Sequence, residues 1–303
     1  MRKVYCSVSI ILCLFLGACG GDSSKEAGGS NASADAVGTK AERATKLRCP
    51  AKIASEPLLH IPTNATVQNL RLGMTLNEVE ATILCEHPGL SVTKSSSGFQ
   101  IKTYTEDAEI QQALFAENTD QSSYGIADDP GEKRFDTMFM GMPGEERLYG
   151  VRFMEIYESG KRPTVETLKK ALIDKYGQTE DALSQNNQYR NSASYSWFYQ
   201  VDGKQVGRNT FRSSSSRSSC AQPHVRSNIG VSNQAIPGCG LIISAYTEGA
   251  ADNPSLAKGV YIAIYDQNSL VESLSEIQEG FEKREQARRD AETEDAGNTS
   301  VDL

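Results

Sequence analysis

The strongest structural signal in the chain is Leu70-Arg71-Leu72-Gly73-Met74-Thr75-Leu76-Asn77-Glu78-Val79. Thr75 and Glu78 have the Thr-x-x-Glu spacing of a capping box, in which each side chain accepts a hydrogen bond from the backbone N–H of the other residue. Met74 before the cap and Val79 after it are placed to form a hydrophobic staple. The apolar residues beyond the cap share one helical face: Leu76, Val79 and Ile83. These features predict a short amphipathic helix that starts after Thr75.

A second capped helix is predicted between Thr164, as its N-cap, and Gly177, as the residue that ends it. The two helices match at three positions when their caps are superposed: Thr75 with Thr164, Val79 with Leu168, and Ile83 with Leu172. The match predicts two similar α+β units, residues 47–160 and 161–292. Two unrelated amphipathic helices would often agree this well, so both explanations stay open.

Short apolar runs follow each helix and predict strands. They are residues 99–103, 135–140, 148–157, 195–201, 241–247 and 260–266. Residues 107–133 instead favour a short helix and an acidic loop, and Gly141-Met142-Pro143-Gly144 favours a hairpin turn. The predicted fold class is therefore α+β, with short helices packed on an antiparallel β-sheet.

The last helix is predicted from an apolar seam made of Leu270, Leu274, Ile277 and Phe281. Beyond Phe281 the charged residues mix in sign, which is typical of a solvated helix. We expect this C-terminal helix to end by residue 292 and a disordered tail to occupy residues 293–303.

The N-terminus has the features of an export signal. Arg2 and Lys3 precede an apolar run, residues 4–15, which is shorter than the ~20 residues of a spanning helix and fits a secretion signal. Leu16-Gly17-Ala18-Cys19 resembles the lipobox of bacterial lipoproteins, in which diacylglycerol is attached to the cysteine before cleavage. The resemblance implies a signal peptide, residues 1–18, and lipidation of Cys19. A plain cleaved signal and an uncleaved anchor are the alternatives.

The lipidated cysteine is followed by a low-complexity segment, residues 19–46, which lacks the large apolar residues that a core needs. We expect it to be a flexible tether between the lipid and a folded body. The residue after Cys19 is Gly20, whereas an Asp in that place retains lipoproteins in the inner membrane. This resemblance favours the outer membrane, with the body facing the periplasm.

Composition limits the classes of partner. Hydrophobic residues make up 38% of the chain, and the formal net charge is −8. A nucleic-acid-binding protein would be expected to carry a basic face, so the charge argues against that class. It favours an acidic body that stands off a membrane surface.

Cysteine usage predicts two disulfides. Of the seven cysteines, Cys6 and Cys13 lie in the signal and Cys19 is assigned to lipid. An even four remain, in an oxidising compartment. Three connectivities are possible, and we favour the pairing of sequence neighbours, Cys49–Cys85 and Cys220–Cys239. A zinc site is the rival interpretation, although no C-x-x-C spacing supports it.

The segment Leu72-Gly73-Met74-Thr75, followed by Glu78-Val79, also resembles the helix start of the SmpA/OmlA lipoproteins, called BamE-like. The same motif occurs in the repeats of the β-lactamase inhibitory protein. The resemblance implies a helical layer on an antiparallel sheet, binding to other proteins, and no catalytic residues. It covers a short part of the chain, which is longer than a typical BamE-like protein.

Catalytic and ligand motifs are scarce. No nucleophile elbow, P-loop, Rossmann glycine pattern or H-E-x-x-H metal motif is present. Cys85 beside His87 would form a nucleophile pair only if its thiol were free. Tyr195, Trp197 and Tyr199 fit either a core strand or an aromatic platform for a glycan. A Ser- and Arg-rich loop, residues 203–237, is the first place to expect contact with an anionic partner, unless it is simply a solvated loop.

Taken together, the sequence predicts a non-catalytic envelope lipoprotein that binds another protein and needs no cofactor or metal. The first alternative is an inhibitor or ligand-binding module of the periplasm, and the second is an envelope hydrolase.

Overall fold

The computed structural model describes residues 49, 51–96, 100–102, 107–109, 111–118, 129–179, 181–187, 190–208 and 238–297, all within one compact unit. Its elements are, in chain order, β1 (Thr66–Val67), β2 (Leu70–Arg71), α2 (Leu76–Glu86), β3 (Ser91–Ser96), β4 (Gln100–Lys102), β5 (Asp107–Glu109), β6 (Gln111–Glu117), β7 (Lys133–Met140), β8 (Arg147–Ile156), the 3₁₀ turn η1 (Ser159–Lys161), α3 (Val165–Tyr176), β9 (Asp181–Asn187), β10 (Arg190–Tyr199), β11 (Gln205–Val206), β12 (Leu241–Gly249), β13 (Ala257–Asp266) and α4 (Gln267–Gly297).

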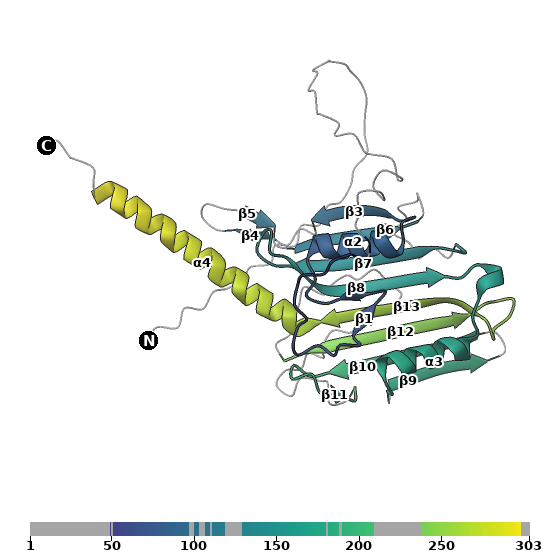
Figure 1. Ribbon diagram of the computed structural model, residues 1–303. Helices are drawn as coiled ribbons and strands as arrows, with labels where there is room; N and C mark the ends of the chain where they lie inside the picture. The colour runs from purple at the N-terminus through teal and green to yellow at the C-terminus, as the bar shows by residue number, and fades with distance from the viewer. Residues whose placement is uncertain are drawn as a thin grey trace, which may run out of the picture. The chain divides into compact units, whose positions relative to one another are not determined.

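Within the described residues, nine strands form one antiparallel sheet in the order β11-β10-β12-β13-β8-β7-β6-β3, with β9 also paired to β10 (Figure 1). Two short hairpins, β1-β2 and β4-β5, lie outside it. The predicted α+β class is therefore confirmed.

Helix α2 forms as its cap predicts. Thr75 is extended and accepts a hydrogen bond from the Glu78 backbone N–H, while the Glu78 carboxylate accepts one from the Thr75 N–H at 2.8 Å. Val79 and Ile83 are fully buried, so the face predicted from their spacing is the face that packs. Helix α3 is capped by Thr164, whose side chain accepts a hydrogen bond from the Thr167 N–H, and it ends at Gly177, whose φ of 89° favours glycine.

Helices α2 and α3 cover the same face of the sheet, and β1 lies between them (Figure 1). We call this the helix face. Its buried side chains form the largest apolar cluster of the described residues, which includes Val79 and Ile83 of α2, Leu172 and Tyr176 of α3, and Phe135, Val151, Phe153, Trp197, Ile243 and Ile264 of the sheet.

The two halves of the sheet follow one plan. The first half runs α2-β3-β6-β7-β8, the second runs α3-β9-β10-β12-β13, and the last strands of the two halves pair with each other. Each helix cap also bridges to the beginning of its own last strand, Thr75 to Arg147 and Thr164 to Leu256. An internal duplication would produce this shared topology. Because β8 pairs with β13, the two units form one continuous sheet.

The strand register also matches between the two halves, residue by residue. At the seam between β8 and β13, Gly150 pairs with Tyr265 and Gly259 pairs with Ile156, so exchanging the two strands superposes one pair on the other. The hairpins β7-β8 and β12-β13 both carry a register shift, after Met138 and after Glu248, which occupy equivalent places.

Three expectations need correction. Residues 107–109 and 111–117 form β5 and β6, where a short helix was expected, because β6 pairs with strands on both sides. The polar strands β3 and β9 were not predicted, since neither has an apolar alternation. Helix α4 continues to Gly297, beyond the expected end at 292, and ion pairs such as Arg288–Glu292 connect its last turns.

Candidate functional site

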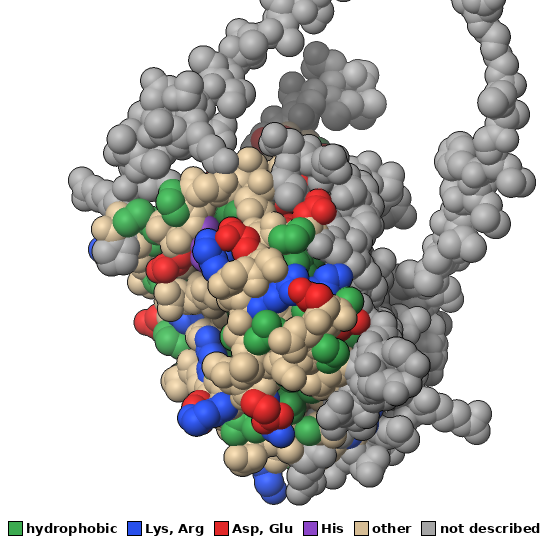
Figure 2. Space-filling view, turned by 90° about the vertical axis from the view of Figure 1, so that its right-hand side faces the viewer, with side chains coloured by type: hydrophobic (Ala, Val, Ile, Leu, Met, Phe, Trp, Pro, Cys, Tyr) green, Lys and Arg blue, Asp and Glu red, His purple; other side chains and the backbone are tan. Residues whose placement is uncertain are grey.

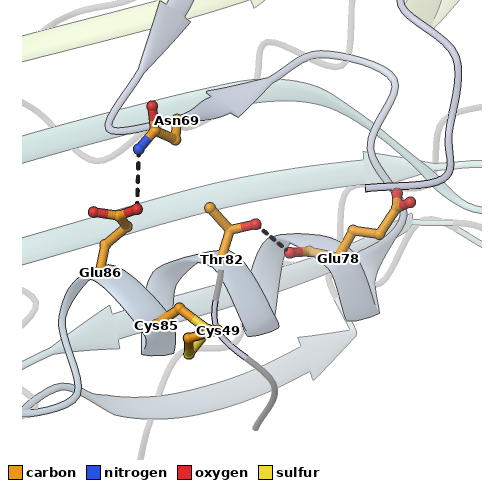
Figure 3. The surroundings of a disulfide bond; sticks show 6 residues. All are labelled: Cys49, Asn69, Glu78, Thr82, Cys85 and Glu86. Atoms are coloured by element: carbon orange, nitrogen blue, oxygen red, sulfur yellow. Dashed lines mark hydrogen bonds between the residues drawn. A yellow bond between two sulfur atoms is a disulfide. The ribbon is translucent and has the colours of Figure 1, made fainter. Parts of the chain in front are cut away.

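The chain enters the folded body across α2, where a disulfide fastens it. The sulfurs of Cys49 and Cys85 lie 2.07 Å apart, which joins the first described residue to the last turn of α2 (Figure 3). This is the local pairing that the sequence favoured. It also removes Cys85 as a free nucleophile and as a zinc ligand.

Glu78 holds the same entering segment at the other end of α2. One carboxylate oxygen caps Thr75, and the other accepts hydrogen bonds from the backbone N–H groups of Ala54 at 2.6 Å and Ser55 at 2.8 Å. Burial raises the pKa of Glu78, but the hydrogen bonds from Thr75, Ser55 and Ala54 outweigh it and lower the pKa from 4.5 to about 2. The group is therefore a carboxylate at any physiological pH.

Arg71 adds a third attachment, because its guanidinium donates to the backbone carbonyl of Ser55. We call these contacts the entry clamp: Cys49–Cys85, Glu78 with Ala54 and Ser55, and Arg71 with Ser55. Only the disulfide and the cap were predictable from the sequence. The contacts of Glu78 and Arg71 with residues 54 and 55 could not be predicted from the sequence, because they are made to backbone groups, which every residue has.

Further along the same entering segment, His60 contacts the residue that precedes the C-terminal helix. Its Nε2 lies 2.9 Å from a carboxylate oxygen of Asp266, whose side chain is completely buried. Asp266 also accepts hydrogen bonds from the backbone N–H groups of Asn268 and Ser269, and so caps α4. The hydrogen bond that the His60 ring donates to Asp266 outweighs burial and raises the pKa of His60 above 6.5.

The opposite side of the sheet, which we call the reverse face, carries a cluster of charges in the first half. The carboxylate of Asp136 accepts a hydrogen bond from Arg134 at 2.8 Å and another from Arg152, and Glu117 lies 3.8 Å from Arg134. Asp136 and Arg152 are only 3% and 7% exposed, so the accessible side chains of this half lie toward its edge, where Thr93 is exposed and Phe115 is partly exposed.

The equivalent positions of the second half hold hydroxyl groups. The strand pairings relate Arg152 to Tyr261, Asp136 to Tyr246, Arg134 to Ser244 and Glu117 to Ser196. The Tyr246 and Tyr261 rings pack with centroids 5.9 Å apart. The same strand arrangement thus forms with uncharged residues at these four positions in the second half. The charged residues of the first half are therefore not needed to form this fold. This cluster was not predictable from the sequence without β6, which supplies Glu117 and was not expected as a strand.

The aromatic residues considered as a glycan platform belong to the core. Tyr195, Trp197 and Tyr199 lie on the helix face with exposures of 4%, 0% and 5%. The indole N–H of Trp197 donates to the carbonyl of Gly177 at 2.9 Å. They offer no surface to a sugar.

Other residues singled out in the sequence are dispersed. His87 packs against the Phe135 ring, and burial lowers its pKa. Glu146 is buried at the β7-β8 hairpin, where its carboxylate accepts a hydrogen bond from Gln112. The Gly141–Gly144 turn joins β7 to β8 as expected.

Several predicted sites lie outside the described residues: Cys19, Cys220, and residues 209–237 of the Ser- and Arg-rich loop. Cys239 is completely buried and takes part in a disulfide, but its pairing with Cys220 stays a prediction.

A cavity of about 340 Å³ opens beyond the end of α3 and is lined by Gln178, Thr179, Gln205, Val206 and Gly207. None of these lining side chains titrates near neutral pH, so they supply no general acid or base. In the described part of the chain, no group of three His, Cys, Asp or Glu residues is placed to hold a metal, and no helix is apolar enough over sufficient length to cross a membrane.

Comparisons with protein-family models, with curated proteins and with solved structures found no match.

Proposed function

We propose that the protein is a lipid-anchored, non-catalytic envelope protein whose body acts by binding another protein. The observation that carries the proposal is the entry clamp. The segment that follows the predicted tether is fixed to α2 by the disulfide and by Glu78, and to β2 by Arg71, so a pull on the N-terminus would be transmitted to the folded body. Such fastening suits a body held by its N-terminus.

We propose the reverse face as the contact surface. Its partly exposed side chains include Arg134, Phe115 and Tyr246, which belong to the residue types that protein interfaces favour. The divergence of its charged half from the equivalent hydroxyl half also supports a role beyond folding. Figure 2 looks onto the side of the molecule and not onto the reverse face; there, acidic and basic side chains are interspersed over the described residues, and hydrophobic ones are scattered among them.

The two alternatives have less support. The inhibitor hypothesis relied on exposed aromatics at Trp197 and Tyr199, and both are buried. The hydrolase hypothesis relied on a free Cys85, which is bonded to Cys49.

Lipidation is tested by metabolic labelling with a fatty-acid analogue, followed by fractionation of the cells. We expect the full-length protein to be labelled and to sediment with membranes, and Cys19→Ser to lose both properties. Cys13→Ser is the matched control, because it also removes a cysteine from the N-terminal segment and should stay labelled. Equal labelling of wild type and Cys19→Ser would refute the anchor.

A further inference from the structure

Helix α4 is held to the body by its first half. Leu270, Ile277 and Phe281 are buried there, and Leu274 is partly buried. They pack on one end of the reverse face, against a surface made of Met138, Met140, Met142, Tyr149 and Tyr265. Three of the six methionines in the chain are therefore concentrated under one helix.

The three methionines differ in access. Met140 is 2% exposed, whereas Met138 and Met142 are partly exposed. The Met142 sulfur lies against the α4 backbone, since a Cβ placed on Gly280 would come within 3.2 Å of it. The Met138 sulfur accepts a hydrogen bond from the Tyr149 hydroxyl at 3.8 Å. Both residues therefore pack in the cluster that α4 covers and keep part of their surface exposed to solvent.

The second half of α4 adds little to its docking. Residues 282–297 are exposed apart from Glu285 and Arg288. The last turns carry four acidic residues, Asp290, Glu292, Glu294 and Asp295, and the final turn has no basic residue. Negative charge at the C-terminal end of a helix interacts unfavourably with the helix dipole. Gly280 further weakens the helix between its two halves. The docking of α4 therefore relies on the apolar contacts of its first half, to which the methionines contribute.

We propose that Met138 and Met142 are oxidation sites that control the docking of α4. Hydrogen peroxide would be the oxidant: a sulfur lone pair attacks one peroxide oxygen, an S–O bond forms, the O–O bond breaks, and water leaves after proton transfer. Sulfur is oxidised by two electrons and peroxide is reduced. The product is a methionine sulfoxide, which a reductase can restore.

Oxidation changes the contact from apolar to polar. A sulfoxide oxygen on Met142, buried against α4 in this apolar cluster, would lose its hydration without a hydrogen bond in return, which is unfavourable. On Met138 the Tyr149 hydroxyl is placed to donate to the new oxygen, so the penalty there is smaller. Undocking of α4 hydrates the sulfoxide and leaves the helix face of the sheet untouched, because that core lies on the other side.

The test exposes the purified mature protein to hydrogen peroxide, maps sulfoxides by peptide mass spectrometry, and follows hydrogen exchange of residues 270–281. We expect Met138 and Met142 to oxidise before Met74, which is 0% exposed, and before Met154, which is 7% exposed. Exchange in α4 should then become about tenfold faster, while exchange in α2 and α3 stays unchanged.

Two variants separate the proposal from general damage. Met138→Leu/Met142→Leu conserves volume and should keep α4 protected at the same peroxide dose. Met154→Leu, on the same face but away from α4, should respond like the wild type. Unchanged α4 exchange with both sulfoxides present would overturn the proposal, as would undocking in the double leucine variant. The wild-type mapping decides the matter even if a variant fails to fold.

Discussion

Glu78 joins two local structures through one carboxylate. It completes the cap of α2 and also holds the entering chain at Ala54 and Ser55. The first role was predictable, because a capping box is written in four consecutive residues. The second role was not predictable, because its partners are backbone N–H groups more than twenty residues away in the sequence. They come close to Glu78 only when the segment before β1 has taken its folded course.

Replacing Glu78 tests this double role. Its pKa is lowered to about 2, so its carboxylate contributes stability that is complete above the unfolded value of 4.5 and is lost as the pH falls toward 2. Glu78→Gln should lower the free energy of unfolding near neutral pH by about 1–2 kcal/mol and should reduce the loss of stability in acid. Urea titrations near neutral pH and in acid measure both effects.

Glu80→Gln is the control for that experiment. Glu80 lies on the same helix and pairs with Lys94 at 2.6 Å on the surface, a contact worth about 0–1 kcal/mol. If the two variants lost the same stability, the entry clamp would contribute nothing beyond a surface ion pair.

His60 gives a stability effect of the opposite pH dependence. Its pKa is raised by the hydrogen bond to Asp266, so its contribution is complete below 6.5 and is lost as the pH rises through the folded pKa. His60→Gln keeps a donor but not the charge. It should therefore destabilise more at about pH 5.5 than at about pH 8.5, as measured by thermal unfolding. An equal loss at both values would contradict the protonated pair.

At the scale of elements, the apolar strands and the capped helices were predictable and the polar edge strands were not. Strands β7, β8, β10, β12 and β13 contain the buried apolar residues that sequence patterns detect. Strand β3, Ser91–Ser96, is polar and mostly exposed, so it owes its place to pairing with β6. No local pattern encodes a partner supplied by the rest of the sheet.

The seam between β8 and β13 gives a prediction for the joined halves. A Cβ on Gly259 would lie 2.6 Å from the backbone oxygen of Glu155, whereas a Cβ on Gly150 would meet the Tyr265 ring at 3.1 Å. A ring can shift more easily than a strand backbone. Gly259→Ala should therefore cost about 1–3 kcal/mol and Gly150→Ala less, by urea denaturation. The reverse order would show that the seam is not packed as described.

For the whole molecule, the sequence predicted the fold class and one complete disulfide but not the surface most suited to contact. The first half of the reverse face is assembled from four separate strands, and its charges become a cluster only once the register is set. Only the matching of the two halves, strand by strand, shows that these charged positions correspond to hydroxyl-bearing residues in the second half.

The central claim is that the anchored body binds an envelope protein through its reverse face. Thr93 and Lys94 provide a matched pair of positions, because they are neighbours on β3 with side chains on opposite faces. Lys94 is on the helix face, where it pairs with Glu80, and Thr93 is exposed on the reverse face beside Phe115.

The most direct measurement is in-cell photo-crosslinking with a photoreactive amino acid at each of these two positions. We predict a discrete protein adduct from position 93, absent from position 94 and lost when Cys19→Ser is combined with it. No adduct from position 93, or the same adducts from both positions, would contradict binding through the reverse face.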